Sequence, residues 1–185
     1  MLKVDKKVLR KKFLKIRENI NNNKESEILL NKKILNFFKN LRNNIVAGYI
    51  SVNHEIDIFD SMTKIVNNNT LCLPEVVKGN QKLNFNKWYV DSEMVTGLFR
   101  IPIPKEKEPI IPNYIIVPLV SFDKKKNRLG YGGGYYDATI NYLRKNNKNL
   151  KTIGAGFDEQ ECSSVPFEKF DEPLDMIITP SKIIK

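Results

Sequence analysis

The stretch YIIVPLVSFDKKKNRLGYGGGYYDATINYL, residues 114–143, contains an apolar run, a glycine-rich turn and an amphipathic segment in that order. The apolar run over 114–122 predicts a strand that is buried on both faces. The segment from Tyr135 to about Lys145 predicts a helix with Tyr136, Ile140 and Leu143 facing inward. A strand that leads through a short loop into a helix is typical of α/β folds, in which crossovers join parallel strands.

The rest of the chain repeats this alternation. Helical spacing of apolar residues predicts helices over 5–20, 24–41 and about 58–65, and short apolar or alternating runs predict strands over 45–52, 70–77, 82–90, 152–157 and 175–180. Prolines between Thr96 and Pro112 predict a long surface loop that borders a site. We therefore predict an α/β fold: a single three-layer, Rossmann-like domain over 1–185, with a mostly parallel sheet flanked by helices.

The first predicted helix has two faces. Its apolar residues recur at helical spacing, at Val4, Val8, Leu9, Phe13 and Ile16. The other face carries Lys6, Arg10 and Arg17, and Lys6 and Arg10 are one turn apart. Spacing alone is equally typical of a solvated surface, so this basic face does not by itself indicate a binding site.

Composition limits the partners and the compartment. The 31 Lys and Arg against 21 Asp and Glu give a net charge of +10, which attracts anions such as nucleic acid, phosphates or polycarboxylates. Cys72 and Cys162 do not form a disulfide framework, although one bridge between them is an open alternative. Apolar runs are too short for a membrane span, so we predict a cytoplasmic protein without a membrane partner. The basic, amphipathic start leaves a mitochondrial or plastid presequence as the alternative.

The glycine-rich turn predicts an anion site. Bare backbone N–H groups at the start of a helix can hold a phosphate chain, and Lys124–Lys126 and Arg128 add positive charge just before the glycines. The pattern is neither a Walker loop nor G-x-G-x-x-G. Asp137, one turn inside the helix, is placed to reach a Mg²⁺ ion that bridges phosphate oxygens. The alternatives are a flexible turn for the glycines and a favourable helix-start charge for Asp137.

The segment SFDKKKNRLGYGGGYYDATI, residues 121–140, resembles the signature of the 5-formyltetrahydrofolate cyclo-ligase (5,10-methenyltetrahydrofolate synthetase) family. In that family an RLG, a glycine-rich turn and a YYD form the nucleotide site. The resemblance extends to KKVLRKKFLKIR (6–17), YISVNHEID (49–57) and the C-terminal segment 154–180, and only residues 60–113 match loosely.

The resemblance implies an enzyme that converts 5-formyltetrahydrofolate to 5,10-methenyltetrahydrofolate with ATP and Mg²⁺, releasing ADP and phosphate. The formyl oxygen is a poor leaving group, so the reaction implied is its phosphorylation followed by attack of N10. Phosphoryl transfer of this kind needs positioning and charge neutralisation more than a protein nucleophile. The implied partners are these two small molecules, and we predict a monomer without a nucleic-acid partner.

The resemblance also implies roles for individual residues. The catalytic residues would be Arg128 and Tyr136. ATP would be held by Lys6, Arg10, Arg128, Leu129, Gly130, Tyr131, Gly132, Gly133, Gly134 and Tyr135. The folate would be held by Tyr49, Glu55, Trp88 and Tyr136, with Glu55 accepting hydrogen bonds from the pterin. The magnesium ligands would be Asp137 and Asp175. Trp88 is equally consistent with a core aromatic residue.

Some residues depart from the family pattern. Glu75 stands where a basic residue is common, so that a charge would be missing or supplied by Lys78, and Ile58 and Phe170 replace a threonine and a histidine. These departures leave open a relative that binds folate without turnover. A nucleic-acid module, with the basic helix and tyrosines 131, 135 and 136 as its surface, is the alternative from another class.

Overall fold

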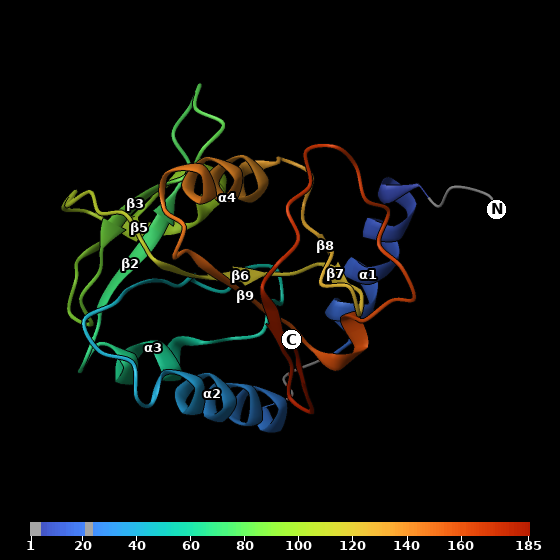
Figure 1. Cartoon of the computed structure of the whole chain (residues 1–185), viewed down its shortest axis with the longest axis horizontal. Coiled ribbons are helices and arrows are strands. Elements are labelled where there is room, and N and C mark those ends of the chain that lie inside the picture. Colours follow the sequence, from blue (N-terminus) through green and yellow to red (C-terminus); the bar gives the residue numbers. More distant parts are fainter. Residues whose placement is uncertain (1–4, 21–23) are drawn as a thin grey trace.

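The computed structural model describes residues 5–20 and 24–185, so the expectations for Val4 and for the asparagine run 21–23 lie outside it (Figure 1). The main sheet comprises β1 (Ile45–Ala47), β2 (Thr70–Glu75), β3 (Asn84–Lys87), β6 (Tyr114–Pro118), β9 (Lys151–Ala155), β10 (Met176–Ile178) and β11 (Ile183–Ile184). Their order is β11-β10-β9-β6-β1-β2-β3. Neighbours from β10 to β2 are parallel, whereas the edge strands β3 and β11 are antiparallel. The predicted mostly parallel sheet is confirmed.

Helices cover both faces of this sheet. The helices α2 (Lys24–Phe38) and α3 (Phe59–Ile65) lie on one face and α4 (Tyr135–Asn146) on the other (Figure 1). Successive strand residues point to opposite faces: Ile116 packs in the core under α2 and α3, whereas Ile115 packs under α4. The predicted α/β architecture of three layers is therefore present.

The N-terminal helix α1 (Lys6–Asn19) packs beside the sheet, on a small ladder formed by β7 (Ser121–Phe122) and β8 (Arg128–Leu129) (Figure 1). Its buried residues are Leu9, Phe13 and Arg17. Two expectations are thus wrong: Val8 is 64% exposed, and Arg17 is only 1% exposed. The face that carries Arg17 packs against the rest of the protein, where the backbone oxygens of Leu119 and Asn53 accept hydrogen bonds from its guanidinium.

Several boundaries differ from the prediction. The helix expected over 24–41 ends at Phe38, and the strand expected over 45–52 ends at Ala47. The single strand expected over 114–122 is divided after Pro118, and its last residues pair with β8 instead. A proline supplies no N–H for a sheet, which favours the break at this point.

The proline-rich segment is not the irregular loop that we expected. β4 (Met94–Thr96) pairs with β5 (Pro102–Pro104), and the short 3₁₀ segment Leu98–Arg100 joins them. A strand in a two-stranded ladder pairs through only one edge, so prolines are tolerated there. The other 3₁₀ segment is Asp158–Gln160. Within the described part of the chain, no helix has the length and apolarity needed to span a membrane.

Candidate active site

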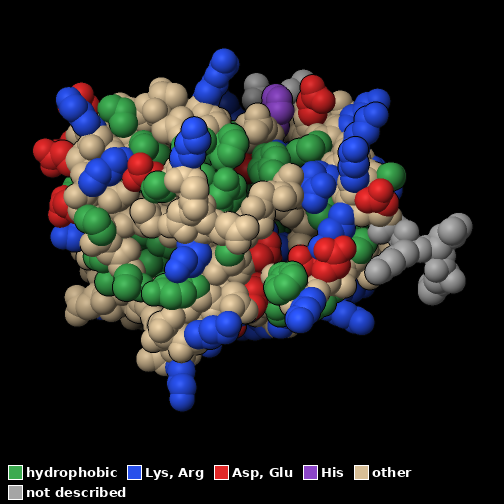
Figure 2. Space-filling model, turned by 90° about the horizontal axis from the view of Figure 1, so that it is seen from above, with side chains coloured by type: hydrophobic (Ala, Val, Ile, Leu, Met, Phe, Trp, Pro, Cys, Tyr) green, Lys and Arg blue, Asp and Glu red, His purple; other side chains and the backbone are tan. Residues whose placement is uncertain are grey.

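Most of the predicted site residues come from three places that the fold brings together. Tyr49 and Glu55 follow β1, and the glycine-rich loop 130–134 follows β8. The helix α1 packs across the ladder formed by β7 and β8. Ligand sites of open α/β sheets lie beyond the carboxyl ends of the strands, where the segment after β1 is located. On the face seen in Figure 2, acidic side chains gather beside a hollow and basic side chains are spread around it.

The base of the glycine-rich loop is fixed by Asp123, which is 2% exposed. Its Oδ1 accepts hydrogen bonds from the backbone N of Lys125 at 2.9 Å and of Asn127 at 3.1 Å, and its Oδ2 accepts one from the backbone N of Val165 at 2.9 Å. An aspartate that bonds the backbone two residues ahead stabilises a tight turn. Asp123 therefore holds Arg128 and the start of the loop in place.

Gly132 and Gly134 of the loop have positive φ, and Gly130 is closely packed. Gly134 is the N-cap of α4 and has a φ of 69°, a left-handed conformation that strains other residues. A Cβ on Gly130 would lie 2.9 Å from Nη1 of Arg128, so only glycine lets this guanidinium lie so close to the loop. Arg10 of α1 holds the loop from outside, because its Nε donates to the Gly130 carbonyl at 2.8 Å.

Arg128 is buried beside the start of α4, with its side chain 4% exposed. Its Nη2 lies 2.8 Å from Oδ2 of Asp137 as an ion pair, and neither Nε nor Nη2 makes a hydrogen bond. The guanidinium also lies 5.6 Å from the ring centre of Tyr136. Buried donors of this kind favour an anionic ligand, because an unmade hydrogen bond is costly.

The segment 161–175, the C-terminal loop, brings three acidic residues toward the site: Glu168, Asp171 and Glu172. The Lys6 ammonium lies 2.6 Å from Oδ2 of Asp171 and 3.1 Å from Oε2 of Glu168. Burial acts to lower the pKa of Lys6, but the hydrogen bonds to Asp171 and Glu168 raise it overall. The backbone N of Glu172 donates to Oδ1 of Asp137 at 3.1 Å. Asp171 is therefore the sequence neighbour of Glu172, whose backbone contacts Asp137 directly.

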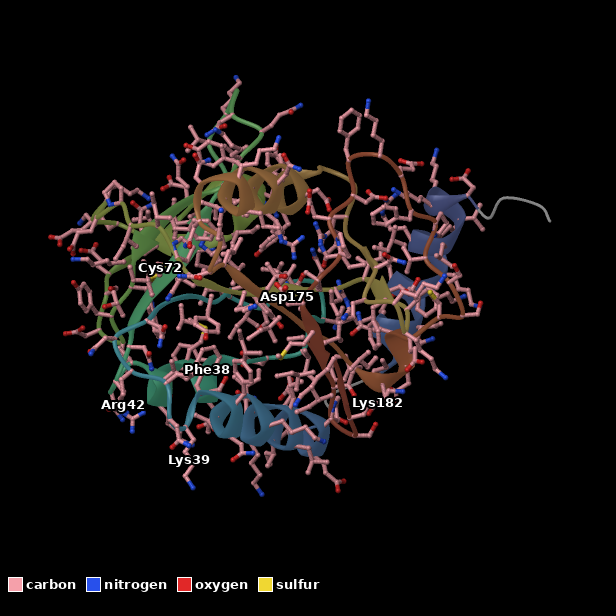
Figure 3. The ribbon with its side chains drawn as sticks, in the orientation of Figure 1. Phe38, Lys39, Arg42, Cys72, Asp175 and Lys182 are labelled. Atoms are coloured by element: carbon pink, nitrogen blue, oxygen red, sulfur yellow. The ribbon has the colours of Figure 1, made fainter. Side chains whose placement is uncertain are left out.

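Asp175 has a different environment. It lies just before β10, near the middle of the molecule (Figure 3). Its Oδ2 accepts hydrogen bonds at 2.7 Å from both the backbone N and the hydroxyl of Thr152, and it lies 3.3 Å from Nη2 of Arg144. Burial acts to raise the pKa of Asp175, but the bonds from Thr152 and the charge of Arg144 lower it overall. The described contacts of Asp175 thus anchor strands, and none joins it to Asp137.

Glu55 lies among the tyrosines Tyr49, Tyr131 and Tyr136. It is 8% exposed, its Oε2 accepts a hydrogen bond from the backbone N of Val52 at 3.1 Å, and its Oε1 is 4.0 Å from Nη1 of Arg17. Burial raises the pKa of Glu55, while Val52, Arg17 and a hydrogen bond from Tyr131 act to lower it. Burial and the charge of Glu55 also raise the pKa of Tyr136. A buried carboxylate of this kind is a strong acceptor for a polar ligand.

Other predicted residues serve the core. Tyr49 is buried and its hydroxyl donates to the Ile56 carbonyl at 2.8 Å. Trp88 is 3% exposed in the core under α2 and α3, and Leu129 is 2% exposed beneath α1. The ring of Tyr135 lies 6.2 Å from that of Phe99 in the proline-rich segment, so this segment does border the loop.

The departures from the family pattern have defined surroundings. Glu75 accepts a hydrogen bond from Asn86 at 2.7 Å and lies 3.0 Å from the ammonium of Lys107, and a substrate contact from Lys78 stays a prediction. Ile58 is fully buried, whereas Phe170 is 80% exposed. Cys72 and Cys162 are free thiols, which excludes the alternative of a bridge between them.

Sequence reasoning missed Arg17, Asp171 and Glu172. Arg17 lies about three turns along the same helix from Lys6, but helical spacing does not tell a buried arginine from a solvated one. The two acids lie 34 and 35 residues beyond Asp137 in a loop without regular structure, so no periodicity indicates them. Within residues 5–20 and 24–185, no three His, Cys, Asp or Glu side chains are grouped to hold a metal.

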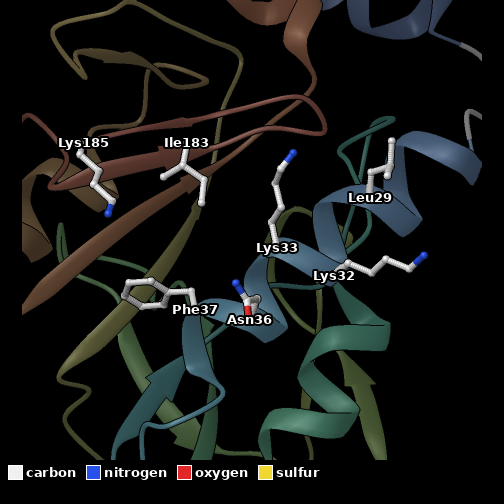
Figure 4. Close-up of a pocket in the computed structure, with 7 residues that line it drawn as sticks. All are labelled: Leu29, Lys32, Lys33, Asn36, Phe37, Ile183 and Lys185. Atoms are coloured by element: carbon white, nitrogen blue, oxygen red, sulfur yellow. The ribbon is translucent and has the colours of Figure 1, made fainter.

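A cavity of about 410 Å³ lies elsewhere, between α2 and β11 (Figure 4). Its lining comprises Leu29, Lys32, Lys33, Asn36, Phe37, Ile183 and Lys185. None of these is a predicted site residue, and the buried acids and arginines of the candidate site are absent from it. We therefore place the candidate active site at the glycine-rich loop rather than at this cavity.

Comparison with known sequences identifies the chain. The sequence model of the 5-formyltetrahydrofolate cyclo-ligase family matches residues 2–180. The 5-formyltetrahydrofolate cyclo-ligase of Escherichia coli K12 is 36% identical over 108 residues, a match that spans 55% of this chain and just over half, 57%, of that protein. The cyclo-ligase of Mycoplasma genitalium is 30% identical over 188 residues, 95% of this chain and 98% of that one.

Solved structures agree with these matches. The NMR structure of Aquifex aeolicus 5,10-methenyltetrahydrofolate synthetase has a TM-score of 0.77 and 26% identity, over 97% of this chain and 92% of that one. The Mycoplasma pneumoniae 5,10-methenyltetrahydrofolate synthetase has a TM-score of 0.76 over 96% of this chain and 99% of that one, and at 23% identity it supports the fold. The chain therefore belongs to the 5-formyltetrahydrofolate cyclo-ligase family.

Proposed function

We propose that this protein converts 5-formyltetrahydrofolate to 5,10-methenyltetrahydrofolate, using ATP and releasing ADP and phosphate. Family membership supports the ring closure, and the structure supports the use of ATP through one observation. Arg128 is buried at the base of the glycine-rich loop with Nε and Nη2 lacking hydrogen-bond partners. A phosphate chain at the loop would supply acceptors for these donors, and the open N-terminus of α4 would add backbone N–H groups.

The chemistry divides between the two halves of the site. The γ-phosphoryl group moves to the formyl oxygen, so a P–O bond forms there as the bond to the ADP oxygen breaks. N10 then attacks the formyl carbon, the C–O bond breaks, phosphate leaves with the oxygen, and N10 loses its proton. Arg128 neutralises charge that spreads over the phosphoryl oxygens, as such transfer requires. Glu55 orients the pterin, and Tyr136 lies near both Glu55 and Arg128.

Magnesium fits the carboxylates at the loop, since this ion commonly uses one or two protein carboxylates together with substrate phosphates. Asp137 would be one ligand, because it lies at the start of α4 beside Arg128. For the second ligand we favour Asp171 over the predicted Asp175, because its neighbour Glu172 contacts Asp137, whereas no described contact joins Asp175 to Asp137. Oδ2 is already paired in both residues, with Lys6 in Asp171 and with Thr152 and Arg144 in Asp175. When bound, the ion would neutralise phosphate charge and help to orient the γ-phosphoryl group.

The first experiment is a turnover assay with (6S)-5-formyltetrahydrofolate, ATP and Mg²⁺, followed by the absorbance of the methenyl product. Native protein should form product only with both ATP and Mg²⁺, and Asp137→Ala and Arg128→Ala should each lose it. Arg42→Ala, a change in the exposed segment that follows α2, is the matched control. Folded native protein that binds folate but forms no product would instead support the relative without turnover. The monomeric state and the cytoplasmic location stay predictions from the sequence.

A further inference from the structure

Arg17 is a charged residue buried far from solvent, with 1% of its surface exposed. Its Nη1 donates to the Leu119 carbonyl at 3.0 Å, and its Nη2 donates to the Asn53 carbonyl at 2.7 Å and to the hydroxyl of Tyr131. Its Nη1 also lies 4.0 Å from Oε1 of Glu55. Burying a charge is costly unless it is paired and hydrogen-bonded, so this arrangement requires an explanation beyond packing.

The partners of Arg17 belong to three separate parts of the site. Leu119 follows β6, Asn53 belongs to the turn before Glu55, and Tyr131 belongs to the glycine-rich loop. The guanidinium also lies 5.3 Å from the ring centre of Tyr131. One side chain from α1 therefore joins the predicted nucleotide loop to the predicted folate carboxylate.

The turn before Glu55 needs such support. Asn53 and His54 have φ values of 49° and 62°, a left-handed conformation at two successive residues. This conformation costs roughly 1–2 kcal/mol for most residues other than glycine, and less for asparagine. The Glu55 backbone N donates to the Val52 carbonyl at 3.0 Å, and the Glu55 carboxylate accepts from the Val52 N. The direction of the carboxylate thus depends on a strained turn that Arg17 holds by the Asn53 carbonyl.

Tyr131 extends this connection to the nucleotide side. It is flanked by Gly130, whose carbonyl Arg10 holds at 2.8 Å, and by Gly132. Its hydroxyl accepts from Arg17, which leaves its own proton directed at an acceptor such as Glu55, and the two side chains interact closely enough to affect each other's pKa. An anion that orders the loop would therefore order the hydroxyl that faces Glu55.

We propose that Arg17 is a positioning residue for the folate substrate, and that through Tyr131 it makes folate affinity depend on occupancy of the glycine-rich loop. The proposal rests on the proposed function, because it assigns the loop to ATP and Glu55 to folate. Coupling between two sites is reciprocal, so each ligand should tighten the binding of the other.

The test is calorimetric titration of (6S)-5-formyltetrahydrofolate into intact protein, without nucleotide and with a saturating non-hydrolysable ATP analogue and Mg²⁺. The analogue should lower the Kd of native protein by about fivefold or more. In Tyr131→Phe this ratio should fall to about one. Tyr142→Phe is the matched control, because it removes an exposed hydroxyl from α4 and should keep the native ratio.

Arg17→Lys keeps the charge but loses the planar fork, so we expect a rise in the folate KM that exceeds the change in the ATP KM. Thermal unfolding of each variant separates this effect from a loss of stability, which would lower the apparent kcat by reducing the amount of folded enzyme and leave both KM values unchanged. A native ratio of one, or a Tyr131→Phe protein with the native ratio, would overturn the proposal. Turnover by native protein distinguishes these outcomes from failure of the proposed function, which would leave no methenyl product at all.

Discussion

Replacing Gly134 by alanine tests whether the backbone at the start of α4 holds ATP. Its φ is +69° and an added Cβ would meet nothing within 4 Å, so the change introduces backbone strain without a clash. Gly79, in the connection between β2 and β3, offers a matched control: its φ is +82° and its Cβ would also meet nothing within 4 Å. None of the predicted ATP ligands belongs to that connection.

The magnitude follows from the left-handed conformation. Strain of about 1–2 kcal/mol is expected for alanine at either position. For a chain of this length that corresponds to a fall in Tm of about 2–8 °C in both variants. In Gly134→Ala the same strain favours a different conformation of the loop in the protein without ligand. ATP binding must then reverse this change, so the KM for ATP should rise about 5–30-fold.

Thermal unfolding and initial rates of methenyl formation at varied ATP measure both quantities. Gly79→Ala should lose stability and keep the native KM for ATP. Two variants with the same fall in Tm and the same unchanged KM would show that the backbone of the loop does not contact the nucleotide, and the assignment of the loop to ATP would then be wrong.

Three further predictions concern the acids. Asp171→Asn should raise the Mg²⁺ concentration needed for half-maximal turnover, whereas Asp175→Asn should leave it unchanged; the reverse result would restore Asp175 as a magnesium ligand. The pKa of Asp175 is lowered in the folded protein, so its ionised carboxylate stabilises the fold at pH values above its usual pKa. This stabilisation is lost as the pH falls through the lower pKa of the folded state. Urea unfolding of Asp175→Asn should thus show a loss of about 1–3 kcal/mol at pH 7 that diminishes as the pH falls through the lowered pKa of Asp175. Because the pKa of Glu55 is raised above 4.5, the native KM for folate should rise as the pH falls through that higher value. Glu55→Gln should have a higher KM at pH 7 and no such acid limb in steady-state rates, and an unchanged limb would contradict the role of Glu55.

The order of the elements was predictable because it depends on local signals. Buried parallel strands are continuous apolar runs, and the run over 114–117 is read directly from the sequence. The ends of elements were less predictable, because they depend on partners: Ala47 ends β1 where its pairing with β6 ends, and Ser121 turns away to pair with Leu129. The edge strand β11, with two residues, carries too few positions for any periodicity.

The site shows the same division. The loop 130–134 and Asp137 are one contiguous signal, so the sequence alone indicated an anion site there. Arg17 and Asp171 lie far from that loop in the chain, and their contacts arise only when α1 and the C-terminal loop meet it. The exposure predicted for Arg17 was wrong because a helix face is buried or solvated according to what packs on it.

Several local features that cost stability lie at the proposed site. Arg128 lacks hydrogen bonds at Nε and Nη2, Asn53 and His54 are both left-handed, and Arg17 places a positive charge in the interior. Each would be disfavoured in a protein selected for stability alone, since unpaired donors, backbone strain and buried charge all weaken the folded state. Phosphate and pterin would supply partners for Arg128 and Glu55. The ligands should therefore stabilise the protein by more than contact area suggests, because binding completes hydrogen bonds that folding leaves unmade.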